Sequence, residues 1–167
     1  RNLTMNWLNI PESNIILASQ SPRRQHLLKE LGLDFSIQTR PVEEVYPENL
    51  EREHIATYLS QLKAAAFQGD LTSDDLLITA DTIVWLDGKM LGKPTDADSA
   101  KNMLHELSGQ THEVITGVTL KNAQKERSFY EVTEVSFVHI YAHEIDYYVE
   151  QFAPFDKAGS YGIQEWI

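Results

Sequence analysis

The segment from Ile15 to Arg24 carries two hydroxyls and two guanidiniums at the point where a strand should give way to a helix. Its first three residues are aliphatic and suit a buried strand, whereas Ser21 is a favoured N-cap and Pro22 suits the first helical position. The N–H groups at the start of such a helix, beside Arg side chains that grip phosphate oxygens in pairs, would bind an anion. The segment therefore predicts a phosphate site, although a capped surface helix with two solvated arginines would have the same sequence.

A second candidate is Asp81, a carboxylate in the middle of the apolar run 76–86. Burying a lone carboxylate is costly, so we expect it to face a cleft, a cation or a metal ion. In a strand with strict alternation Asp81 points away from its neighbour Thr82, so either a bulge intervenes or Asp81 is reached from the opposite side. A purely structural Asp–Lys pair is the plainer alternative.

The Asp87-Gly88 pair that closes this run predicts a two-residue hairpin loop. Such a loop pairs Leu86 with Lys89, and counting outward then sets Thr82 opposite Lys93. The hairpin would bring an ammonium group to the strand that carries the buried carboxylate.

The segment from Pro154 to Gln164 is rich in glycine and contains the charged pair Asp156-Lys157. Glycines at this spacing often mark only turns. Gln164, however, could present an amide that both donates to and accepts from the edge of a nucleobase.

The composition limits which partners these groups can serve. The chain has 167 residues, 42% of them hydrophobic, which is enough for one compact domain or one domain in two lobes. Fourteen Lys and Arg against 25 Asp and Glu give a net charge of −11, which disfavours nucleic acid polymers and anionic membranes as partners. Without cysteine, disulfides and thiolate chemistry are excluded. No apolar run reaches membrane-spanning length and no signal peptide is visible, so a cytoplasmic protein is expected.

Hydrophobic periodicity predicts helices and strands in alternation, and hence an α/β fold with a mixed sheet. One predicted helix has Lys63 at the edge of its apolar face, and Thr95 with Asp98 resembles a capping box that opens another. The face beside Lys63 consists of Ile55, Leu59, Leu62 and Ala66. The expected strands cover 15–17, 35–39, 76–86, 113–120 and 130–140, and a last helix is expected over 145–152.

Several motifs follow one another in a fixed order along nearly the whole chain. They are S-Q-S-P-R-R (19–24), V-E-E (42–44), L-K-A (62–64), A-D-T (80–82), G-K-P (92–94), L-S-G-Q-T-H (107–112), T-G-V (116–118) and D-K-A-G-S-Y-G-I-Q (156–164). This ordered series closely resembles the Maf-like nucleotide pyrophosphatases. The resemblance implies a single domain over residues 1–167, with a two-lobed, mixed-sheet α/β fold related to that of the inosine-triphosphate pyrophosphatases and a nucleotide in its central cleft.

The resemblance also implies cleavage of a nucleoside triphosphate to the monophosphate and pyrophosphate, assistance by a divalent metal (Mg²⁺ or Mn²⁺), and usually a homodimer. The family pattern continues past Y-G-I-Q into a Gly-rich apolar stretch and a G-L-P motif, and that end of the pattern is missing from this chain. If this tail is truly absent, a sheet edge would be left open and activity would suffer; if it is only missing from the sequence given, nothing changes.

Members of the family that act on dTTP and UTP carry Arg after S-x-S-P, Thr after A-D and Gln at the end of Y-G-I-Q. These positions correspond to Arg23, Thr82 and Gln164, so the resemblance favours dTTP and UTP, with modified pyrimidine nucleotides as further candidates. A 7-methyl-GTP pyrophosphatase of the same family is the nearest alternative. A non-catalytic nucleotide-binding regulator of septum formation is another, although such a protein would have little reason to keep two carboxylates beside a polyanion.

Hydrolysis at the α-phosphorus needs an in-line water, neutralised phosphate oxygens and a stabilised pyrophosphate leaving group. Asp81 is expected to orient or deprotonate the water or to bind the metal, and Glu43 is expected as the second carboxylate and metal ligand. Lys63 and Lys93 complete the expected catalytic set. The groups expected to hold the triphosphate are Ser19, Arg24, Lys63, Lys93 and Lys157.

Overall fold

The computed structural model describes residues 13–163 of the chain, which falls into two compact units. Unit 1 contains the described residues up to Pro47 together with Thr57–Asp81 and Gly117–Phe129. Unit 2 contains Glu48–Ala56, Thr82–Thr116 and the described residues from Tyr130 onward.

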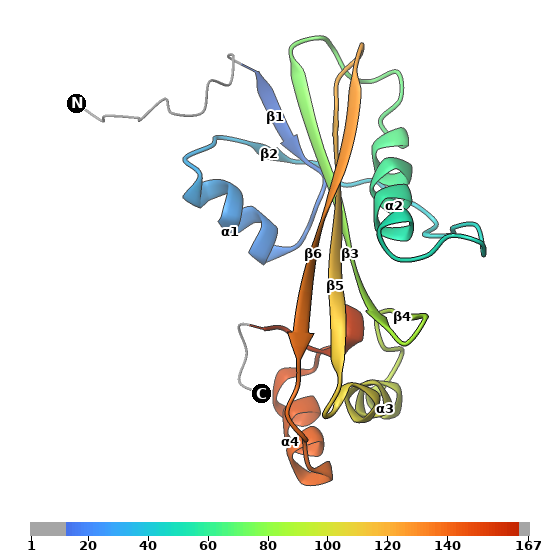
Figure 1. Cartoon of the computed structure of the whole chain (residues 1–167). Coiled ribbons are helices and arrows are strands. Elements are labelled where there is room, and N and C mark those ends of the chain that lie inside the picture. The colour runs from blue at the N-terminus through green and yellow to red at the C-terminus, as the bar shows by residue number, and fades with distance from the viewer. Residues whose placement is uncertain (1–12, 164–167) are drawn as a thin grey trace. The chain divides into compact units, whose positions relative to one another are not determined.

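The described residues form strands, α-helices and one short 3₁₀ helix, η1 (Figure 1). In chain order these are β1 (Asn14–Leu17), α1 (Pro22–Glu30), β2 (Ser36–Ile37), α2 (Glu53–Ala65), β3 (Asp75–Leu86), β4 (Lys89–Leu91), α3 (Ala97–Leu107), β5 (Thr111–Lys121), β6 (Glu126–Ser136), α4 (Ala142–Phe152) and η1 (Ala158–Ser160). The sheet has the order β2-β1-β3-β5-β6, with β4 paired to β3. Strand β1 runs parallel to β2 and β3, whereas β4 runs antiparallel to β3. The predicted α/β fold with a mixed sheet is confirmed.

Helix α1 begins where the sequence predicts. Ser21 is its N-cap and accepts a hydrogen bond from the Arg24 N–H at 3.4 Å, and Pro22 is its first residue. Beyond its end, Gly32 adopts a φ of +74°, which residues other than glycine rarely adopt. The helix has no buried residue, and its Leu27 is 58% exposed.

Helix α2 packs with a face that overlaps only in part with the one that the sequence predicts, and Ile55 of the predicted face is buried. Leu59 is buried as expected, but Leu62 is only half-buried, whereas Ser60 is fully buried and Lys63 is 20% exposed in its side chain. The polar side chains are turned inward because they find polar partners there, and these partners lie far away in the sequence. The apolar core of unit 1 consists of Ile16, Ala64, Phe67 and Leu77.

In unit 2, helices α3 and α4 pack together over an apolar core. The N-cap of α3 is Asp96, which accepts a hydrogen bond from the Ser99 N–H at 2.7 Å, so the predicted Thr95–Asp98 capping box is wrong by one residue. The core consists of Val84, Leu86, Leu91, Ala100, Leu104, Leu107, Ile140, Ile145, Tyr148, Val149 and Tyr161.

The hairpin at Asp87-Gly88 is confirmed, since Leu86 pairs with Lys89, but its extension to a Thr82–Lys93 pair is wrong. Strand β4 ends at Leu91, and the Gly92 carbonyl accepts instead from the Gly159 N–H at 3.1 Å. Pairing cannot readily resume beyond this point because Pro94 has no N–H to donate.

Strand β6 covers Glu126–Ser136 rather than the predicted 130–140. The chain reverses early because Asn122 Oδ1 accepts from the N–H groups of Gln124 and Lys125, a turn that asparagine side chains favour. The polar residues that follow can begin a strand because β6 lies at the end of the strand order and is largely exposed. Among residues 13–163, no helix is long and apolar enough to cross a membrane.

Candidate active site

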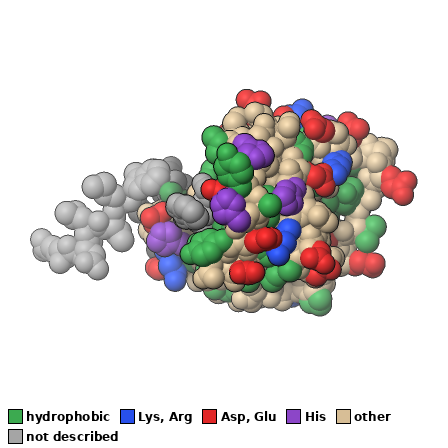
Figure 2. Space-filling model, turned by 90° about the horizontal axis from the view of Figure 1, so that it is seen from below, with side chains coloured by type: hydrophobic (Ala, Val, Ile, Leu, Met, Phe, Trp, Pro, Cys, Tyr) green, Lys and Arg blue, Asp and Glu red, His purple; other side chains and the backbone are tan. Residues whose placement is uncertain are grey.

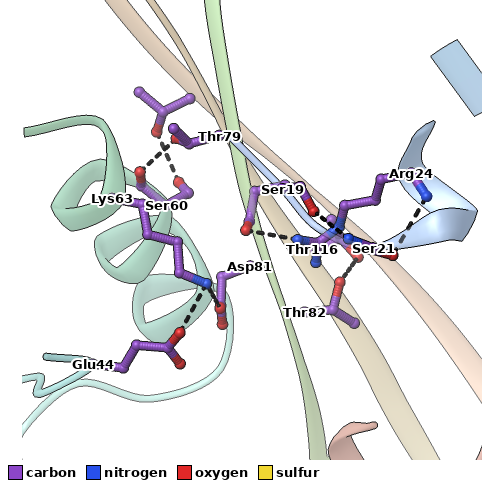
Figure 3. A network of polar contacts seen from close by, with 12 residues as sticks. Ser19, Ser21, Arg24, Glu44, Ser60, Lys63, Thr79, Asp81, Thr82 and Thr116 are labelled. Carbon is purple, nitrogen blue, oxygen red and sulfur yellow. Dashed lines mark hydrogen bonds and ion pairs between the residues drawn. The ribbon is translucent and has the colours of Figure 1, made fainter. Parts of the chain in front are cut away.

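The centre of the candidate site in unit 1 is an ion pair between β3 and α2. Lys63 Nζ lies 2.5 Å from Asp81 Oδ1 and 3.2 Å from Glu44 Oε1, so one ammonium group bridges two carboxylates (Figure 3). Asp81 is 8% exposed and the Lys63 side chain 20% exposed, whereas the Glu44 side chain is 44% exposed. Two of the three charges are thus largely removed from water and neutralise each other.

Asp81 reaches Lys63 from the face of β3 that is turned toward α2. Thr79, two residues earlier, donates to the carbonyl of Ser60 on the same helix, at 2.6 Å. Residues two apart on a strand share a face, so Thr79 and Asp81 both point toward α2. Of the two alternatives that the sequence leaves open, Asp81 reached from the side opposite Thr82 agrees with these contacts.

Burial and charge act on Asp81 in opposite directions. Burial raises the pKa of the Asp81 carboxyl, the Lys63 ammonium lowers it, and the net shift is upward from the ordinary aspartate value. The Glu44 carboxylate adds to the rise, and the Arg24 guanidinium counters it. A buried aspartate with a raised pKa is a stronger base than an exposed one once it is ionised.

Arg24 reaches this centre from the start of α1. Its Nη1 donates at 2.9 Å to the carbonyl of Ala80, the residue that precedes Asp81 in β3. Burial lowers the pKa of Arg24, and the Asp81 carboxylate counters this. Ser19 is buried, and its Oγ accepts from the Ser21 N–H at 3.1 Å, an arrangement that does not use the hydroxyl proton. The predicted phosphate corner therefore lies in the same unit as the carboxylate pair.

Glu44 provides the second carboxylate at Lys63, whereas the residue predicted from the sequence is its neighbour Glu43. Glu43 is exposed, and its assignment remains a prediction. Neighbouring acidic residues in an irregular connection cannot be ranked from the sequence, because no strand or helix period fixes which of them points inward. Arg23, also exposed, occupies the first turn of α1.

Three further predicted site residues, Thr82, Lys93 and Lys157, belong to unit 2. Thr82 Oγ1 lies 2.9 Å from Thr116 Oγ1 in a half-buried pair. Lys93 is exposed, and Lys157 Nζ lies 3.9 Å from Asp156 Oδ1 with its side chain 13% exposed. Gln164 lies outside the described residues.

The carboxylates fit a divalent cation that takes few ligands from the protein. Magnesium is commonly bound by one or two carboxylates together with phosphate oxygens and water, and Asp81 and Glu44 already converge on a single cationic group. Between residues 13 and 163 there is no group of three or more His, Asp or Glu side chains that could enclose a metal alone.

The sequence model of the family described as Maf-like protein matches residues 14–167. The chain belongs to the Maf-like family. This membership confirms the resemblance drawn from the ordered motifs. A solved structure with a similar fold supports the fold that the resemblance implies. The Ham1 protein of Staphylococcus aureus matches with a TM-score of 0.54 over 74% of this chain and 71% of that protein, at 14% sequence identity, which shows a common fold alone.

Two relatives of this Maf-like chain carry a named activity. A dTTP/UTP pyrophosphatase of Phocaeicola vulgatus is 53% identical over 160 residues, covering 95% of this chain and 83% of the relative. A dTTP/UTP pyrophosphatase of Flavobacterium psychrophilum is 51% identical over 155 residues, covering 93% of this chain and 80% of the relative.

Proposed function

We propose that this Maf-like chain is a nucleoside triphosphate pyrophosphatase that hydrolyses dTTP and UTP to the monophosphate and pyrophosphate. The relatives that share about half of its residues bear that activity in their names. The observation that carries the mechanism is the pair of carboxylates joined by Lys63, with Arg24 and the start of α1 in the same unit. This arrangement offers a base beside groups that bind phosphate.

Asp81 acts on the attacking water in the proposed mechanism. Its ionised carboxylate accepts a proton from the water as the water oxygen attacks the α-phosphorus, and the bond from that phosphorus to the bridging oxygen breaks to release pyrophosphate. Lys63 holds one oxygen of Asp81, so the orientation of the carboxylate is fixed before the substrate arrives.

Cationic side chains and the helix start neutralise the phosphates. Arg24, Ser19 and the N–H groups of α1 bind phosphate oxygens, and Lys93 and Lys157 are proposed as further phosphate ligands. Asp81 and Glu44, with Glu43 as a further candidate, would hold Mg²⁺ or Mn²⁺. When bound, such an ion neutralises charge on the phosphate oxygens.

The choice of pyrimidine nucleotides is assigned to Arg23, Thr82 and Gln164. This assignment rests on the match of these three residues to the members of the family that act on dTTP and UTP. The proposal extends to a homodimer in the cytoplasm, which light scattering and cell fractionation would test.

Replacing Asp81 with Asn tests the mechanism. We expect kcat to fall about 10³-fold while nucleotide binding, measured by calorimetry, persists, because the amide keeps the shape and removes the base. Asp74→Asn is the control, since it removes an exposed carboxylate just before β3. Retention of most activity in Asp81→Asn would refute the role of this residue.

A panel of nucleoside triphosphates with Mg²⁺ or Mn²⁺ tests the reaction. Release of pyrophosphate from dTTP and UTP supports the proposal. Orthophosphate release would indicate an ordinary phosphatase, preference for 7-methyl-GTP would contradict the substrate, and binding without product would indicate a regulator.

A further inference from the structure

A chain of hydroxyl groups connects α2 to the sheet in unit 1. Ser60 Oγ lies 2.7 Å from Thr119 Oγ1 on β5, and Thr119 Oγ1 lies 2.9 Å from Ser128 Oγ on β6. Gln61 Nε2 donates to Ser128 Oγ at 3.1 Å, so the chain begins and ends on the same helix. Ser60 and Thr119 are fully buried.

All the hydrogen bonds in this chain are satisfied together when they run in one direction. The Ser60 hydroxyl then donates to the carbonyl of Thr57 at 2.8 Å and accepts from Thr119. In this arrangement Thr119 accepts from Ser128, and Ser128 accepts from the Gln61 amide. Bonds aligned in this way polarise and strengthen one another.

Such a chain restricts the position of α2 more strictly than apolar packing would. Aliphatic side chains tolerate small sliding and rotation of a helix on a sheet, whereas a buried hydroxyl that loses its partner costs about 1–3 kcal/mol. Thr79 adds a second attachment, because its hydroxyl donates to the carbonyl of Ser60 at 2.6 Å. The helix is therefore fixed at Ser60 by its side chain and by its backbone.

The attachment lies directly beside the ion pair of the candidate site. Lys63 follows Ser60 by three residues on α2, which places both side chains on one face of the helix. Asp81 follows Thr79 by two residues on β3, which places both on one face of the strand. Figure 3 shows Ser60 and Lys63 on the helix facing Thr79 and Asp81 on the strand.

We propose that Ser60, Thr79 and Thr119 are positioning residues that set the rotation of α2 so that Lys63 meets Asp81. None of them need touch the substrate; each acts through the two charged side chains. The catalytic consequence of this inference rests on the proposed function, whereas the position of Lys63 does not.

The test compares two variants at one position. Thr119→Val keeps the shape of the side chain and removes its hydroxyl, whereas Thr119→Ser keeps the hydroxyl. We expect Thr119→Val to lower kcat for UTP about tenfold with KM changed less than twofold, since displacing a catalytic group by even a fraction of an ångström slows the chemical step. Thr119→Ser should keep most of the activity.

The control is Thr111→Val, which removes a hydroxyl from the same strand β5. Thr111 pairs with Ser136 at 2.7 Å in an exposed position of unit 2, so its loss should leave kcat unchanged. Equal values of kcat in Thr119→Val and Thr119→Ser would overturn the proposal, because a purely structural role would change the melting temperature alone.

A second measurement does not depend on turnover. In ¹⁵N-labelled protein, the ammonium protons of Lys63 should exchange slowly with water while Asp81 holds them, and Thr119→Val should speed this exchange several-fold. If the exchange speeds up but Lys63→Met keeps full activity, the positioning stands and the catalytic role of Lys63 fails. Unchanged exchange in Thr119→Val would refute the positioning itself.

Ser128→Ala provides a variant at the less buried end of the chain, in case Thr119→Val does not fold. It removes the donor to Thr119 and leaves the Ser60 contact in place. We expect a smaller fall in kcat than in Thr119→Val and the same direction of change in Lys63 exchange. An effect on stability without either change would count against the proposal.

Discussion

At the residue scale, Asp81 could be selected from the sequence, but its contacts with other side chains could not. A carboxylate inside an apolar strand is conspicuous, because its burial needs a compensating charge. Lys63 was also expected in the catalytic set, from the family motif, yet its direct contact with Asp81 depends on how α2 rotates. The role of Ser60 was missed, although a serine between Leu59 and Leu62 on an otherwise apolar face is a signal that could have been noticed.

His112 provides a prediction for the dependence of stability on pH. Its Nε2 lies 2.6 Å from the hydroxyl of Tyr161, and burial lowers the pKa of His112 from the ordinary value of 6.5 while it raises the pKa of Tyr161 to about 12. Below pH 6.5 the unfolded chain therefore binds a proton that the folded chain resists. Stability from this residue is fully present above pH 6.5 and is lost as the pH falls toward the lowered pKa.

The measurement is the melting temperature at pH 7.5 and at pH 5.5. We expect His112→Gln to reduce the difference between the two values, because the titrating group is gone. His105→Gln, which removes an exposed histidine from the last turn of α3, serves as the control. The same difference in His112→Gln as in the parent would contradict this account.

At the element scale, the boundaries that depend on adjacent residues were predicted well. The N-cap of α1 and the hairpin at Asp87-Gly88 follow from two or three neighbouring residues, so the sequence determines them locally. The start of β6 and the inward face of α2 depend on contacts with distant segments, so the predicted start of β6 is wrong and the face of α2 is predicted only in part. The hydrophobic pattern is least reliable where a polar side chain is buried because it finds a hydrogen-bond partner far away in the sequence.

Gly159 provides a prediction at this scale, because a residue with a Cβ atom does not fit its position without strain. It has a φ of +69°, and a Cβ atom there would lie 2.8 Å from Val84 Cγ2. Gly159→Ala should lower the free energy of unfolding by about 2–4 kcal/mol, since it adds a steric clash to a strained backbone.

Gly69→Ala is the matched control for Gly159→Ala. Gly69 has a φ of +88°, but a Cβ atom there would meet nothing within 4 Å. This variant should lose only about 1–2 kcal/mol, the cost of the left-handed backbone. Thermal or urea denaturation measures both, and equal losses would show that the contact with Val84 has no effect.

At the scale of the whole molecule, the net charge of −11 causes the protein to repel polyanions. Acidic side chains are spread over the face shown in Figure 2, with few basic ones between them. The anionic substrate of the proposed reaction must therefore be bound by local groups such as Arg24 and the N–H groups at the start of α1, not by the field of the molecule as a whole.

This charge predicts that nucleic acids are not partners. At about 0.1 M salt we expect no retention of the protein on double-stranded DNA or on vesicles of anionic lipid, because binding of polyanions requires a surface that releases their counterions. Gel-shift and vesicle co-sedimentation assays measure this. Binding that weakens steeply with added salt would show a basic surface that the overall composition conceals.

The buried hydroxyls between α2 and the sheet have a consequence for protein engineering. Exchanging both members of a buried hydrogen-bonded pair for apolar groups often preserves or raises stability, so a Ser60→Ala, Thr119→Val double variant could resist heat as well as the parent. In the same variant, α2 would pack on an apolar surface that does not fix the rotation of the helix. Selection for heat resistance and selection for turnover would then favour different residues at these two positions.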